Sequence, residues 1–184
     1  MVVLPTHIID GIENHRMKQV VQEYAQDFAS IAVADALLAT EADYENVAKA
    51  LWESLKDEVG DAPLILMGHG TEHVADGSYE SFETAIRNYA AHEIYIATVE
   101  GAVTIEDVIV RMQKKHASST NKKMSNQRVV VTPFMLVAGD HANNDMAGGM
   151  QEAEDGEPEE DSFAGKLQAA GYAPDCIIRG IGEY

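Results

Sequence analysis

The feature of this chain that most restricts its fold is an alternation of short apolar runs with longer segments of helical periodicity. The runs are rich in Val, Ile and Leu, and the segments between them carry apolar residues every three or four positions. Parallel strands need such crossover segments, because the chain must return to the same edge of the sheet before each new strand. The alternation therefore predicts an α/β protein with a parallel sheet.

Local signals place the elements along the chain. Thr40 and Thr104 suit the N-cap positions of two of the helices, and Gly60 ends the first of these. The predicted strands are 2–9, 31–38, 64–67, 94–99, 128–137 and 176–179. The predicted helices are 13–28, 41–59, 79–91, 105–115 and 162–170. One face of the first helix should collect Met17, Val20, Val21, Tyr24 and Phe28.

The spacing of the strands suggests an uneven division of the chain. The last four strands would form a self-contained four-stranded unit over residues 60–184, to which the first two strands do not obviously belong. We therefore predict a boundary near Thr40, with residues 1–40 as a separate part and the helix 41–59 as the connector. The polar stretches 116–127 and 151–161, the second with seven acidic residues, are expected to be exposed loops.

Composition excludes several classes of partner. With 13 basic and 31 acidic residues the formal net charge is −18, which opposes binding to nucleic acid or to an anionic membrane surface. No apolar run approaches the roughly 20 residues of a membrane span, and the first residues do not resemble a secretory leader. Cys176 has no second cysteine to pair with and is expected to be a small buried side chain. A cytoplasmic protein is the expectation.

Polar residues at three strand ends are the strongest chemical signal. His69 follows the third strand within a glycine turn, Glu100 follows the fourth, and His141 follows the fifth after Gly139 and Asp140. Open α/β sheets bind ligands at the carboxyl ends of their strands. Two imidazoles and a carboxylate there would suit a divalent transition metal such as cobalt, nickel, iron or zinc. The alternative is that each is a polar loop residue bonded to nearby backbone.

Neighbouring residues carry weaker signals. His73 is expected to be exposed or to support His69, and a carboxylate at Glu13 is favoured in any first helical turn by the helix dipole. Four residues beside His141 could orient it through its second nitrogen or could simply close their own turn, namely Asp140, Asn143, Asn144 and Asp145. Motifs for phosphate loops, dinucleotides, thiol redox chemistry and serine hydrolases are missing from the sequence.

Several motifs together resemble one family. The segments MGHGTEH, IATVEG, PFMLVAGDHANNDMAG and the terminal GIGE are similar to those of the anaerobic sirohydrochlorin cobalt chelatases, the class II chelatases of early cobalamin synthesis. The opening LPTHIIDGIEN resembles the end of that family's third strand. The resemblance runs in order over nearly the whole chain.

The resemblance implies a function and a site. It implies insertion of cobalt(II) into sirohydrochlorin or a related tetrapyrrole, with the metal as substrate and no prosthetic group. Iron and nickel remain alternative metals, and non-catalytic binding of metal or tetrapyrrole remains an alternative function. By resemblance the metal site falls on His69, Glu100, His141 and Glu13, the first three being catalytic. The candidate contacts to the tetrapyrrole are Gly70, Asp140, Asn144 and Arg179.

The family is built from two similar α/β lobes, with the tetrapyrrole in the cleft between them. Measured against that pattern, residues 1–40 resemble a remnant of the N-terminal lobe and residues 60–184 the C-terminal lobe, without the closing helix. Missing neighbour strands would leave an open sheet edge and an apolar face. We therefore expect the chain to form a homo-oligomer through residues 1–40 or to be part of a longer product. A single monomer peak with a cooperative melt would contradict this expectation.

Overall fold

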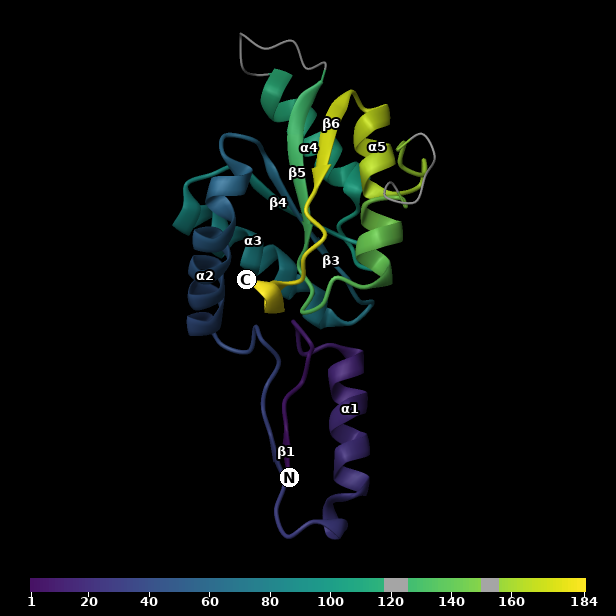
Figure 1. Cartoon of the computed structure of the whole chain (residues 1–184). Helices are drawn as coiled ribbons and strands as arrows, with labels where there is room; N and C mark the ends of the chain where they lie inside the picture. The colour runs from purple at the N-terminus through teal and green to yellow at the C-terminus, as the bar shows by residue number, and fades with distance from the viewer. Residues whose placement is uncertain (118–125, 150–155) are drawn as a thin grey trace.

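The computed structural model describes residues 1–117, 126–149 and 156–184, and it places them in a layered body with a projecting arm. The body contains a four-stranded sheet in the order β4-β3-β5-β6, in which every neighbouring pair is parallel. The strands are β3 (Leu64–Gly68), β4 (Ile94–Thr98), β5 (Gln127–Pro133) and β6 (Tyr172–Cys176). Figure 1 shows helices on both sides of this sheet, as the alternation predicted. The α/β fold class is confirmed.

Alternate residues of each strand face opposite layers. Leu64 and Leu66 of β3 belong to the core under α2 (Glu41–Val59) and α3 (Gly77–Ala90). Ile65 and Met67 belong to the core under α4 (Ile105–Ala117) and α5 (Phe163–Ala169). All four side chains are 0% exposed. Both faces of the sheet are therefore covered, which is why β3 and β4 are continuous buried runs instead of alternating polar and apolar residues.

Capping residues set the starts of two helices where the sequence predicted them. The hydroxyl of Thr40 accepts a hydrogen bond from the backbone N–H of Asp43, and the Asp43 carboxylate accepts one from the N–H of Thr40. Thr104 and Asp107 form the same reciprocal pair at α4. Each box satisfies N–H groups that the helix itself cannot satisfy. Both N-cap predictions are confirmed.

The arm comprises residues 1–40 and extends away from the body (Figure 1). It contains β1 (Val2–Val3), α1 (Ile12–Glu23), the short helix η1 (Ala25–Asp27) and β2 (Ala32–Val33), with β1 parallel to β2. The predicted strands 2–9 and 31–38 are therefore wrong in length. Pro5 has no N–H to donate, and regular pairing ends before it. The two segments still lie side by side, because Leu38 donates a backbone hydrogen bond to the carbonyl of Ile8.

The first helix is also shorter than predicted, and its apolar face is not a core face. It ends at Glu23 instead of Phe28, and Val20 and Tyr24 are 54% and 57% exposed. At the other end of the arm, Ile8 and Ile9 are buried in the core of the body. The arm is thus anchored at its base and uncovered along its length. No helix in the part of the chain that the structure describes is long and apolar enough to cross a membrane.

Two predicted strands of the body are corrected by the structure. The fifth strand stops at Pro133 instead of Val137, and the last strand covers Tyr172–Cys176 instead of 176–179. Gly171 and Pro174 look like turn residues in the sequence, but β6 is an edge strand, where proline is tolerated. Residues 118–125 of the predicted loop 116–127 and residues 151–155 of the predicted loop 151–161 lie outside the described residues. The ends of the first predicted loop are corrected, because α4 continues to Ala117 and β5 begins at Gln127.

Two backbone N–H donors on the outer edge of β4 are occupied. The N–H of Ile96 donates to the buried carboxylate of Glu83 at 2.8 Å, and the N–H of Thr98 donates to the carbonyl of Val103 at 2.8 Å. Arg87 and Arg111 pair with the same carboxylate and lie over the ring of Tyr95. The side chains of α3 and α4 therefore close this edge of the sheet.

Candidate functional site

In this strand order, the connections that follow β3 and β5 lead to opposite sides of the sheet. After β3 the chain crosses to β4 on one side, and the later strands β5 and β6 lie on the other side. The position between the carboxyl ends of β3 and β5 is therefore the switch point of the sheet, where open α/β folds bind their ligands. His69 follows β3 directly, and His141 follows β5 by way of a short loop.

The structure brings these two histidines together. Their ring centroids lie 4.8 Å apart with an interplanar angle of 90°, although 72 positions (141 − 69) separate them in the sequence. Both side chains are partly exposed, His69 at 44% and His141 at 35%, so a ligand can reach them. The adjacency of the strands predicted this approach.

The hydrogen bonds of both rings select the same tautomer. Nδ1 of His69 lies 3.1 Å from the carbonyl oxygen of Gly70, and Nδ1 of His141 lies 2.6 Å from the carboxylate of Asp145. A carbonyl or an ionised carboxylate only accepts, so each Nδ1 must carry the proton and donate it. Each neutral ring therefore presents its Nε2 lone pair, which is the atom that binds a metal ion or accepts a proton.

Glu100 lies next to His69, but on the side of the imidazole that carries Nδ1. Its Oε2 is 3.9 Å from Nδ1 of His69, not beside Nε2, and its side chain is 62% exposed. Across residues 1–117, 126–149 and 156–184, no group of three His, Cys, Asp or Glu side chains is arranged to hold a metal ion. The pair of imidazoles is thus assembled, and the carboxylate must rotate if it is to share an ion with them.

A π-helical turn, η3 (Ala142–Met146), follows His141 directly, and no pattern in the sequence predicted it. Such turns are rare and occur mostly at functional sites. The turn places Asp145 where it can bond to the imidazole four residues earlier. Of the four residues that could orient His141, the structure selects Asp145, because Asn144 bonds to Asp140 and Asn143 bonds to the carbonyl of Gly139.

Glycines allow the loops after β3 and β4 to lie against each other. Gly70 has φ +84°, and a Cβ on it would lie 2.2 Å from the backbone nitrogen of Gly101. The N–H of Glu100 donates to the carbonyl of His69 at 2.8 Å. The Gly70 N–H also approaches the hydroxyl of buried Tyr79, whose pKa is raised to about 12 by burial. A contact role for Gly70 with the tetrapyrrole remains a prediction, whereas its packing role is visible.

Other predicted residues have partners of their own. The Glu13 carboxylate pairs with Arg16, while Gly11 at the start of the same helix lies against the side chain of Thr71 in the loop after β3. The guanidinium of Arg179 pairs with Glu58 and lies 4.3 Å from the ring centroid of Tyr184. The structure therefore brings α1 close to the His69 loop, but it does not bring these two charged groups to the histidines.

His73 and Cys176 have structural roles. Nδ1 of His73 accepts the N–H of Ala75, and its ring contacts that of His15 with centroids 5.2 Å apart. Burial, followed by the charge of Asp175, raises the pKa of the Cys176 thiol to about 12, so the thiol stays protonated. A protonated thiol is a poor metal ligand.

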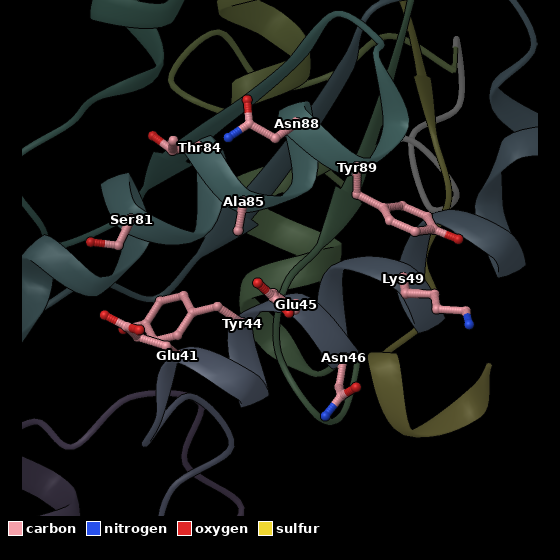
Figure 2. A pocket seen from close by; sticks show the side chains of 10 residues that line it. All are labelled: Glu41, Tyr44, Glu45, Asn46, Lys49, Ser81, Thr84, Ala85, Asn88 and Tyr89. Atoms are coloured by element: carbon pink, nitrogen blue, oxygen red, sulfur yellow. The ribbon is translucent and has the colours of Figure 1, made fainter.

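A cavity of about 1010 Å³ lies away from the histidines, between α2 and α3. Figure 2 shows side chains from both helices around it. They are mostly polar or charged, namely Glu41, Tyr44, Glu45, Asn46, Lys49, Ser81, Thr84, Ala85, Asn88 and Tyr89. None of the predicted site residues lines this cavity, and the ring of Tyr89 already bonds through its hydroxyl to Glu53.

The fold and the paired imidazoles define an α/β protein with a histidine site at the switch point of a parallel sheet. A family model described as cobalt chelatase (CbiK) matches residues 1–184, so the chain belongs to that family. It is 30% identical over 181 residues to a sirohydrochlorin cobaltochelatase, CbiKC, of Nitratidesulfovibrio vulgaris (strain Hildenborough). It is 28% identical over 180 residues to a sirohydrochlorin cobaltochelatase of Salmonella typhimurium (strain LT2).

The alignments cover this chain and its relatives unequally. They include 97% and 96% of this chain, but only 57% and 60% of the two relatives, respectively. The chain therefore spans less than two thirds of the length of the curated proteins that it matches.

Proposed function

We propose that this chain inserts cobalt(II) into sirohydrochlorin, with the metal as substrate. The observation that carries the proposal is the pair of imidazoles at the switch point, whose rings lie 4.8 Å apart and whose hydrogen bonds leave both Nε2 atoms available. Membership of the cobalt chelatase family and the names of two relatives support the choice of metal and of tetrapyrrole.

Metal insertion makes two demands on a protein. The ion must be held by ligands that release it, and the macrocycle must lose two pyrrole protons as its nitrogens bind the ion. A neutral imidazole meets both demands, because Nε2 binds a borderline divalent metal and also accepts a proton near neutral pH. His69 and His141 would hold cobalt(II) and then take up the protons, and Glu100, once rotated, would serve as a third ligand or as a proton acceptor.

Two histidines and one carboxylate leave coordination positions open. An ion bound in this way can exchange its remaining water for ring nitrogens, whereas a closed four-ligand site would retain it. Glu13 is a further candidate for the role of carboxylate ligand or proton acceptor, since α1 begins beside the His69 loop. Engaging it would require the carboxylate to leave Arg16, in a pair whose side chains are more than 60% exposed and therefore weakly held.

A second function, binding of metal or tetrapyrrole without turnover, is favoured by one observation. The matched region covers only 57% and 60% of the two relatives, so the activity in their names belongs to longer proteins than the region that this chain matches. The same two histidines would account for stoichiometric binding.

Incubation of the chain with sirohydrochlorin and cobalt(II) separates the two functions. We expect the visible bands of the tetrapyrrole to shift to those of the cobalt complex, in an amount that exceeds the amount of protein. Saturation at one equivalent would indicate binding alone, and no change beyond the protein-free rate would refute both functions. Parallel reactions with nickel(II) and iron(II) would show which metal the chain prefers.

The bond between His141 and Asp145 gives a separate prediction. Replacing Asp145 by Ala removes the acceptor that keeps the proton on Nδ1, so the ring loses its fixed tautomer and orientation. Partners of metal-bound histidines typically contribute about 10- to 100-fold to metal affinity, and we expect a loss of that size for cobalt(II) by calorimetric titration. Asn143→Ala in the same turn is the control. Equal affinities for the two variants would contradict the prediction.

A further inference from the structure

Asp76 occupies an unusual position for a helix-capping residue. It precedes α3 at the N-cap, where an aspartate normally accepts hydrogen bonds from the first N–H groups of its own helix. The structure shows no such bond from α3 to the Asp76 side chain. Its two carboxylate oxygens instead accept backbone N–H groups from two loops that belong to different strands.

One oxygen bonds to each loop. Oδ1 accepts the N–H of Thr71 at 3.0 Å, in the loop that follows β3 and carries His69. Oδ2 accepts the N–H of Ala102 at 2.9 Å, in the loop that follows β4 and carries Glu100. Hydrogen bonds to an ionised carboxylate are roughly twice as strong as those between neutral groups. Asp76 therefore ties together the two segments that present the imidazole and the carboxylate.

The close packing of the Asp76 carboxylate between the two loops depends on Gly101. A Cβ at Gly101 would lie 2.4 Å from Oδ1 of Asp76 and 2.5 Å from the hydroxyl of Thr98. The carboxylate therefore rests directly against the backbone that follows Glu100. The loops can approach this closely only because their contact points are Gly70 and Gly101, as described above.

We propose that Asp76 is a positioning residue that holds Glu100 beside His69 and thereby raises the affinity of the site for a divalent transition metal. This inference rests on the proposed function, because it assigns a role to the distance between two of the proposed ligands. Asp76 itself does not contact the ion. It acts by restricting the two loops, so that Glu100 reaches the metal by rotating its side chain without movement of the backbone.

The test compares cobalt(II) affinity, measured by calorimetric titration, for the unaltered chain and for Asp76→Ala. We expect Asp76→Ala to bind cobalt(II) about 10-fold more weakly or worse, in the range found for groups that orient metal ligands. Asp76→Asn keeps the shape but offers only one acceptor oxygen, so its affinity should fall between the two. If the alanine variant does not fold, Asp76→Asn provides the comparison of cobalt(II) affinity instead.

Asp107→Ala is the matched control, because Asp107 is likewise a carboxylate at the start of a helix but accepts its hydrogen bonds, among the described residues, from Thr104 of the same cap. It should lower the melting temperature without weakening cobalt binding. A purely structural role for Asp76 predicts the same result for Asp76→Ala. A double-mutant cycle with Glu100→Gln adds a second readout, since Glu100→Gln should have a smaller effect on affinity once Asp76 is absent.

The outcomes separate this inference from the function on which it rests. If the unaltered chain binds cobalt(II) and both Asp76 variants bind it equally well, the positioning role is wrong and the proposed function stands. Additive effects in the double-mutant cycle would also overturn the positioning role. If the unaltered chain does not bind cobalt(II), the proposed function and this inference both fall.

Discussion

Replacing His141 by Ala should reduce the rate of cobalt(II) insertion into sirohydrochlorin by about 10²- to 10⁴-fold, the contribution typical of a positioned proton-transfer group. The variant loses one of the two Nε2 atoms at the switch point and leaves Asp145 without its partner. His69 alone would have to hold the ion and accept protons. The measurement is the initial rate of the visible spectral change under conditions in which the unaltered chain turns over.

A histidine outside the site provides the control for this prediction. His116 pairs with Glu93, which precedes β4. His116 therefore lies at the amino ends of the strands, whereas His141 lies at their carboxyl ends. His116→Ala should insert cobalt(II) at a rate within a few-fold of the unaltered chain. Unchanged turnover in His141→Ala would remove His141 from the mechanism, and equal losses in both variants would indicate general unfolding.

Replacing Phe134 by Ala should lower the free energy of unfolding by about 3–5 kcal/mol, the usual cost of truncating a buried phenylalanine. Phe134 follows β5 and is 0% exposed. Its ring stacks on that of Phe82 with centroids 4.4 Å apart and an interplanar angle of 4°. Removing it leaves a cavity between the sheet and α3, and the aromatic contact is lost as well.

Urea unfolding followed by circular dichroism measures this effect. Val137→Ala is a suitable control, because Val137 lies in the same loop but is 68% exposed, and surface substitutions usually change stability by less than about 0.5 kcal/mol. A midpoint for Phe134→Ala no lower than that of Val137→Ala would show that the stacked pair does not support the core. The backbone N–H of Phe134, which donates to the carbonyl of Met67, is retained in the alanine variant, so the expected loss comes from the side chain alone.

The parts of the fold that the sequence predicted are those determined by nearby residues. The start of α2 follows from Thr40 and Asp43, three positions apart, and the buried strands follow from continuous apolar runs. The proximity of His69 and His141 followed from a simple consequence of topology, since neighbouring parallel strands end at the same edge. These inferences needed no knowledge of distant contacts.

The wrong element boundaries and the missed site residues arose where a proline, a distant contact or the position of a strand in the sheet decides the outcome. Pro5 shortened β1, although the run around it has high strand propensity. Pro174 was tolerated in β6 because that strand lies at the edge of the sheet. Asp76 carried no motif, and its importance appears only when the loops after β3 and β4 are seen together. The choice of Asp145 among four polar neighbours likewise depended on a π-helical turn.

The closed outer edge of β4 has a consequence for self-association. The donors of Ile96 and Thr98 are already taken by Glu83 and Val103, so another molecule cannot add a strand there without breaking these bonds. At the opposite edge of the sheet, Pro174 in β6 interrupts the row of backbone N–H donors with which an added strand would pair. A second copy that added a strand to this sheet would therefore have to displace existing bonds, whereas the exposed apolar side chains of the arm, among them Val20, Tyr24 and Phe28, could pack against another molecule without such a change.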